Sequence, residues 1–224
     1  MRAPASWLSW LLPPATMLVI VVAAVLVLTT PPWMHRAIPA ADGGLPGGST
    51  EQVLMASDQT VNELLFGPGT FQIQPPCPPG AFCGLASLYK PDEIAHLRDA
   101  RAVLYLFVSL AAAAAVLIGA ALVRAPRDPR RWRAIARGGA GLAVGVVVLG
   151  AFAIVAFDTA FELFHRIFFP GGNWAFPADS NMIRLYPYAF WQLTAVALGG
   201  LCIILGGATW WIGRHRAASL EARR

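Results

Sequence analysis

The chain changes character at one stretch: Asp158-Thr-Ala-Phe161-Glu162-Leu-Phe164-His165-Arg166-Ile-Phe168-Phe169-Pro170-Gly-Gly-Asn173-Trp174. It follows a fully apolar segment and is at once charged and aromatic. At about 100° per residue, Asp158, Glu162 and His165 lie at i, i+4 and i+7 on one face of a helix. Pro170 and two glycines then end that helix. The stretch therefore predicts two carboxylates and an imidazole on one stripe, where a membrane helix meets water.

Four phenylalanines crowd this stripe, and they admit a purely structural interpretation. Aromatic residues at a membrane boundary usually form an interfacial belt. A single histidine there is more often a packing residue or a hydrogen-bonding anchor than a catalyst. The stripe by itself favours the structural interpretation, so a functional one needs a second observation.

The composition places the chain in a membrane. Of its 224 residues, 57% are hydrophobic and 13% charged, whereas soluble domains average roughly 25% charged residues. Four segments reach the roughly 20 apolar residues that cross a bilayer, at about 7–28, 102–123, 138–157 and 189–212. We expect one integral membrane domain: an all-α protein of four transmembrane helices whose two outer loops form a small cap of helical and irregular structure.

The net charge of +5 does not indicate a nucleic-acid partner, because the basic residues are sorted by topology. Arginines fill the connection 124–137 and the C-terminal tail, whereas the connections 29–101 and 158–188 hold most of the acids. This is the positive-inside pattern. It predicts that both termini and the arginine loop are cytoplasmic and that the two longer loops lie outside.

The first segment reads as a retained transmembrane helix, since its apolar run is longer than that of a signal peptide. Pro13 and Pro14 mark a kink or the start of this helix. Pro31 and Pro32, followed by Trp33, read as a stop and an interfacial anchor after it.

The first outer loop carries an amphipathic helix and two cysteines. Ser49-Thr-Glu-Gln52 has the pattern of a capping box and predicts the start of that helix. Cys77 and Cys83 lie in a proline-rich run outside the membrane, where a disulfide is plausible and two free thiols are the alternative. The spacing of these cysteines matches neither a redox nor a zinc motif, and Cys202 reads as a packing residue.

A second imidazole lies beside carboxylates at the outer end of another span. His96 and Asp99 are at i and i+3 just before the second span, with Asp92 one turn back. His165 lies at the same depth on a different span, and this coincidence is the second observation that favours function. His35 and His215 look incidental.

The second outer loop ends on Arg184 and Tyr186, which face the entrance of the last span together with Phe190 and Trp191. For Tyr186 and the two aromatic residues after it, an interfacial belt is the competing interpretation. Arg184 and Tyr186 are candidates for contacts to an oxyanion or a lipid headgroup.

Three motifs together resemble the bacterial four-helix integral membrane family of the lipoprotein intramolecular transacylase, Lit. The motif around His165 is the most specific, and the likeness is weak between residues 37 and 89 and after the last span. The motifs are Glu93-Ile-x-His96-x-x-Asp99, Asp158-x-x-Phe161-x-x-Phe164-His165-x-x-Phe168-Phe169-Pro170-Gly-Gly-Asn173-Trp174 and Ile183-Arg184-Leu-Tyr186-Pro187-x-x-Phe190-Trp191.

The resemblance implies an acyltransferase of the bacterial cytoplasmic membrane. It implies transfer of the sn-2 acyl chain of an S-diacylglyceryl cysteine to the α-amine of the same cysteine, with diacylated lipoproteins or membrane lipid as partners. The family's two functional histidines map onto His96 and His165, and no cofactor or metal is implied.

The residues suit this chemistry, because an imidazole takes and gives protons near neutrality. We expect one histidine to act as general base on the amine and the other to donate to the oxyanion or the leaving oxygen. Asp99 would orient His96, and Asp158 or Glu162 would orient His165.

Two other interpretations remain open on the sequence. A non-catalytic membrane protein, such as an envelope chaperone or assembly partner, would use the same histidines and acids as a structural polar cluster. A metal site built on His96 and His165 is disfavoured, because the histidine spacing matches no zinc motif.

Overall fold

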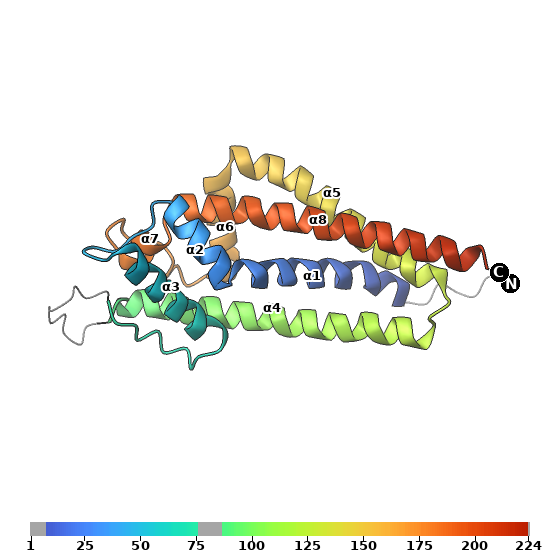
Figure 1. Cartoon of the computed structure of the whole chain (residues 1–224), viewed down its shortest axis with the longest axis horizontal. Helices are drawn as coiled ribbons and strands as arrows, with labels where there is room; N and C mark the ends of the chain where they lie inside the picture. Colours follow the sequence, from blue (N-terminus) through green and yellow to red (C-terminus); the bar gives the residue numbers. More distant parts are fainter. Residues whose placement is uncertain (1–7, 76–86, 224) are drawn as a thin grey trace. The chain divides into compact units, whose positions relative to one another are not determined.

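The computed structural model describes residues 8–75 and 87–223, and every regular element in those two ranges is an α-helix (Figure 1). The all-α fold predicted from the sequence is confirmed. The described residues form two compact units. One takes the chain up to Val25, Leu106–Val155 and the part from Ala197 onward; the other takes Leu26–Tyr105 and Ala156–Val196.

In the described part of the chain, four helices are long and apolar enough to cross a membrane, as predicted: α1 (Leu8–Leu28), α4 (Pro91–Arg124), α5 (Pro129–Val155) and α8 (Tyr188–Glu221). Three of them extend well beyond the apolar segments of the sequence, so charged turns continue the same helices. The acids in the first turn of α4 favour this continuation, because they lie where the helix dipole stabilises negative charge.

Within the first unit, α5 and α8 approach each other at a pair of glycines. A Cβ atom on Gly139 would lie 2.5 Å from the carbonyl oxygen of Gly206, and one on Gly206 would lie 2.7 Å from that of Gly139. Only glycine allows two backbones to meet this closely. Small residues at such a crossing are the usual basis of helix association in a bilayer.

The second unit is built from the short helices α2 (Pro31–Ala40), α3 (Thr50–Leu65), α6 (Phe157–Phe168) and α7 (Asn181–Leu185), with the first turns of α4 and α8. The predicted capping box begins α3: Ser49 accepts from the backbone of Gln52, whose side chain accepts from the backbone of Ser49. An apolar core joins α2, α3, α7 and the first turns of α4 and α8, with Ile38, Phe71 and Leu185 fully buried.

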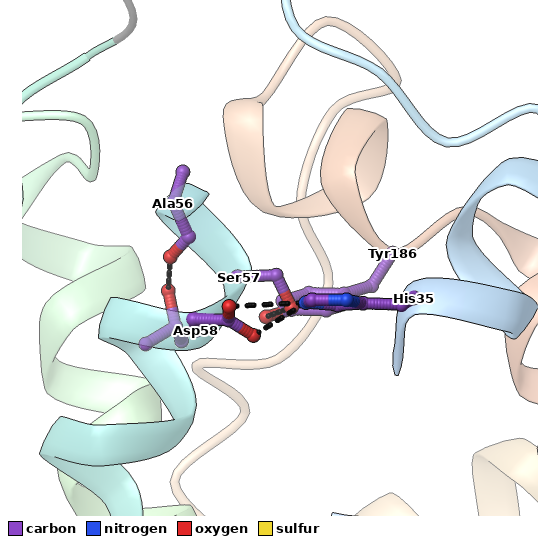
Figure 2. Close-up of polar contacts among 6 residues, drawn as sticks. His35, Ala56, Ser57, Asp58 and Tyr186 are labelled. Carbon is purple, nitrogen blue, oxygen red and sulfur yellow. Dashed lines mark hydrogen bonds and ion pairs between the residues drawn. The ribbon is translucent and has the colours of Figure 1, made fainter. Parts of the chain in front are cut away.

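Buried hydroxyls link α3 to the segments before α4 and after α7. The hydroxyl of Tyr186 lies 3.2 Å from Ser57 Oγ, and that of Tyr89 lies 2.8 Å from Thr60 Oγ1. Figure 2 shows Tyr186 beside Ser57, with His35 of α2 reaching the carboxylate of Asp58 on α3. Both tyrosines are buried, and this burial raises the pKa of each phenol, so both hydroxyls remain protonated and neutral.

Glu93 fixes the start of α4 to the start of α7. Its side chain is 1% exposed, and its two carboxylate oxygens accept from the backbone N–H groups of Lys90, at 2.7 Å, and Met182, at 3.0 Å. Asn181 adds a hydrogen bond of 2.7 Å to the carbonyl of Leu88. Glu93 therefore locks the turn of α4 that precedes His96.

Candidate active site

The structure brings His96 of α4 and His165 of α6 together. Their ring centroids are 6.0 Å apart with an interplanar angle of 26°, so the imidazoles stack. They are 9% and 8% exposed, although both lie on helices with many exposed neighbours. Two titratable rings from distant parts of the sequence therefore lie together in one site that is largely buried from solvent.

Aromatic side chains surround both imidazoles. Phe169 touches the two rings, with centroid distances of 4.7 Å to His96 and 5.6 Å to His165. Phe161 and Trp174 pack on His165 at 4.1 and 5.0 Å, and Phe176 lies 5.7 Å from His96. Phe164 also contacts His165, at a centroid distance of 5.3 Å, although its side chain remains half exposed.

The protonation state of His165 follows from its contacts. Nδ1 lies 2.8 Å from the carbonyl oxygen of Phe161. A carbonyl only accepts, so Nδ1 carries the proton and donates. In the neutral ring Nε2 is then the basic nitrogen. Burial lowers the pKa of His165 below its usual value, which keeps the imidazole neutral at physiological pH.

The carboxylates expected to orient His165 are engaged elsewhere. Asp158 accepts a hydrogen bond from Tyr188, and Glu162 pairs with Arg166 at 2.6 Å, one turn along the helix. Both acids are exposed. The sequence places them on the same stripe as His165, but the ring turns back to the carbonyl one turn before it, so the orienting group is backbone rather than side chain.

His96 has a buried nitrogen in need of a partner. Its Nδ1 makes no hydrogen bond to any described residue. Asp99, expected to orient this ring, instead accepts from the side-chain amide of Asn173 at 2.7 Å. An unpaired buried polar atom costs about 1–3 kcal/mol. Such a cost is commonly tolerated where a ligand supplies the missing bond.

Arg184 and Tyr186 lie apart from the imidazoles. The hydroxyl of Tyr186 belongs to the buried hydroxyl cluster of Figure 2, and its carbonyl accepts from Trp191 at 3.1 Å. The exposed Arg184 lines a different, open hollow of about 520 Å³ together with Asp42 and Ile183. No described contact connects either residue to His96 or His165.

An open hollow of about 330 Å³ lies where α4 and the end of α6 face each other. Its walls are apolar apart from one carboxylate. It is lined by Asp99, Ala102, Val103, Phe168, Phe169, Pro170 and Gly171. Phe169 forms part of this wall and also touches both imidazoles, so the hollow adjoins the histidine pair.

The remaining expectations concern metals and cysteines. Among the described residues, no group of three or more His, Cys, Asp or Glu side chains is placed to hold a metal ion. Cys77 and Cys83 lie outside the described residues. Cys202 is a buried free thiol in α8.

Sequence reasoning gave two residues of this site too little weight. Asn173 and Trp174 entered the sequence analysis only as the end of the motif around His165, yet one binds Asp99 and the other packs on His165. Their position directly after the Pro-Gly-Gly turn, which folds the chain back toward α6, was the available signal.

The fold and site together define a class: a four-span membrane protein whose second unit encloses two stacked imidazoles within aromatic walls. A family model, that of the lipoprotein intramolecular transacylase Lit, matches residues 80–191, half of the chain and the part that carries both histidines. The chain belongs to this family.

Two solved structures share this fold, and one curated relative is similar in sequence. The membrane integral Lit of Bacillus cereus is similar with a TM-score of 0.75 at 13% identity, over 96% of both chains. A histidine-to-arginine variant of that protein gives 0.68 at 13% identity, over 97% of this chain and 93% of its own. An uncharacterised protein of Aquifex aeolicus is 27% identical over 115 residues, and this chain spans about half of that relative's length.

Proposed function

We propose that this protein is a membrane transacylase that moves an acyl chain from the diacylglyceryl group of a lipoprotein's N-terminal cysteine to the α-amine of that cysteine. The observation that carries the proposal is the stacked pair His96 and His165, buried in an aromatic enclosure within the region that matches the family. The substrates are diacylated lipoproteins embedded in the membrane.

The reaction balances within one substrate molecule. The ammonium loses a proton, and its nitrogen attacks the carbonyl carbon of the sn-2 ester. The new C–N bond gives a tetrahedral oxyanion, and the C–O bond to glycerol then breaks. The nitrogen loses its second proton, and the glycerol oxygen gains one. The products are an amide, a free hydroxyl and one released proton, so no external reactant is consumed.

The site needs no nucleophile of its own, because the substrate amine is already tethered near the ester. Holding the two groups in a reactive geometry lowers the barrier by as much as about 7–11 kcal/mol in ideal cases. The aromatic walls formed by Phe161, Phe169 and Trp174 are suited to confining the folded substrate and excluding water.

The two imidazoles take different roles in this proposal. His165 is the general base, since its Nδ1 proton is held by the carbonyl of Phe161 and its Nε2 is left to accept. His96 donates to the oxyanion or to the leaving oxygen, and its unpaired Nδ1 gains a partner in the complex. Asp158 and Glu162 help to position α6, and Tyr186 stabilises the packing of the second unit. Arg184 is left as a contact for a lipid headgroup.

We also propose that the site faces outward across the bacterial cytoplasmic membrane, with both termini inside. The support is the charge pattern: arginines crowd the connection from α4 to α5 and the end of α8, whereas the connections that carry the histidines are acidic.

The decisive experiment is mass spectrometry of lipoprotein N-termini from cells with and without the protein, and with variants. We expect His96→Ala and His165→Ala each to reduce acyl transfer at least 100-fold, because each removes a group that moves a proton. His215→Ala, at an exposed histidine on the far end of α8, is the matched control and keeps full transfer.

The alternative is a non-catalytic membrane protein in which the histidines form a structural cluster. Detergent melting separates the two functions: the transacylase requires variants that keep the melting temperature and lose transfer. Transfer that persists in both histidine variants, or is absent with the wild-type protein, contradicts the enzyme.

A further inference from the structure

The open hollow beside the histidine pair continues the catalytic face of both helices. On α4, His96, Asp99 and Val103 lie at i, i+3 and i+7, one above another. Phe168, the last residue of α6, and Phe169, directly after it, follow His165 by three and four residues. The residues that line the hollow are thus one or two turns beyond each imidazole. A molecule in this hollow would extend directly from the reacting groups.

Of the described residues that line the hollow, Asp99 alone is charged. Its neighbours Arg98 and Arg101 turn away, since Arg98 donates to the carbonyl of Gly69 at 3.2 Å and Arg101 to that of Glu63 at 2.7 Å. Asp99 forms no ion pair with any described residue. The helix therefore presents a carboxylate to an apolar hollow while binding both adjacent cations elsewhere.

The carboxylate of Asp99 accepts one hydrogen bond and can accept more. The amide of Asn173 donates to Oδ2 at 2.7 Å, and Oδ1 has no partner among the described residues. The hydrogen bond fixes the orientation of the group, and the second oxygen is left to accept from a ligand. The ligand that matches this hollow is a cation joined directly to an apolar chain.

We propose that Asp99 binds the α-ammonium group of the lipid-bearing substrate, an inference that rests on the proposed transacylase function. Before transfer this group is a cation, and after transfer it is a neutral amide. The carboxylate attracts the first and has no charge to pair with in the second. Asp99 therefore selects substrate over product, and it holds the nitrogen one turn from His96.

The test measures binding without turnover. Two probes are synthesised: an S-(2,3-dialkoxypropyl)cysteinyl tetrapeptide with ether-linked chains and a free amine, and the same peptide with its amine acetylated. Ethers carry no acyl group to transfer, so neither probe reacts. Binding to the full-length protein in detergent is measured at pH 6.5, where the amine is charged.

We expect the wild-type protein to bind the free amine about 10–100-fold more tightly than the acetylated probe, the range of a charge-assisted hydrogen bond. Asp99→Asn keeps an oxygen for the amide of Asn173 but loses the charge, so the preference disappears while affinity for the acetylated probe stays the same. Asp92→Asn, an exposed acid earlier on α4, is the matched control and keeps the preference. A melting curve of each variant shows that it is folded.

Three outcomes overturn the proposal: equal binding of both probes by the wild-type protein, a preference retained in Asp99→Asn, or an equal loss for both probes in that variant. The ammonium site and the proposed function fail separately. A wild-type protein that prefers the free amine but transfers no acyl chain in cells retains the site and loses the reaction.

Discussion

At the scale of single residues, the back-bonded imidazole of His165 determines how activity responds to pH. Protonation of Nε2 removes the base, and burial lowers the pKa of this ring below its usual 6.5. The acid limb of kcat/KM, which reports the free enzyme, is therefore expected to have its midpoint below pH 6.5 and to fall about tenfold per pH unit under it. The ammonium of the substrate stays fully charged over this range, so it adds no limb. A limb centred at or above 6.5 contradicts the assignment of the base.

The lowered pKa of His165 also makes the folded protein less stable as pH falls. As pH falls below about 6.5, the unfolded chain takes up a proton at His165 before the folded one does. The folded state therefore loses stability as pH falls from 6.5 toward the lowered pKa. Protein stability in detergent should decline in the same window as activity, and His165→Ala should remove part of this decline.

The residue scale also shows what the sequence predicts and what it does not. Helical spacing and depth selected His96 and His165, because both lie at helix ends beside acids. Spacing also suggested Asp99, Asp158 and Glu162 as partners of these histidines, and in the structure each of these carboxylates binds another side chain. A shared helix face brings side chains near each other. The acceptor that His165 binds is instead the backbone carbonyl of Phe161, and a pattern of side chains does not reveal backbone acceptors.

At the scale of elements, Glu93 is expected to be a principal support of the second unit. Glu93→Gln leaves one oxygen to accept where two backbone N–H groups now bind, from Lys90 and Met182. Because one buried donor loses its acceptor, we expect a loss of about 1–3 kcal/mol in unfolding free energy. Thermal unfolding in detergent measures it, with the exposed Glu51→Gln as control. Equal melting of both variants contradicts the role.

Two helix boundaries differ from the prediction, because backbone conformation sets them and residue composition does not reveal it. Pro31 and Pro32 read as a stop, yet they begin α2, because proline fits the first turn of a helix, where its missing N–H is not needed. The predicted third span ran through to Phe157, but the helix breaks at Ala156, with φ −129° and ψ 47°. Alanine gives no signal of a break there, and that break separates α5 from the helix that carries His165.

At the scale of the whole molecule, hydropathy and charge were sufficient for the four membrane helices, since both are summed along the chain. Which residues meet across helices is not a sum: matched depth suggested the histidine pair, but its stacking and the Gly139–Gly206 crossing became visible only in the fold. The charge asymmetry still makes a molecular prediction. Alkaline phosphatase fused after residue 223 should be inactive, because the enzyme needs an oxidising compartment, and inserted at residues 46–48 it should be active. A fluorescent reporter that folds only in the cytoplasm should give the reverse at both positions. Activity at residue 223 would put the acidic connections, and with them His96 and His165, on the cytoplasmic side, where a lipoprotein's modified cysteine is not presented.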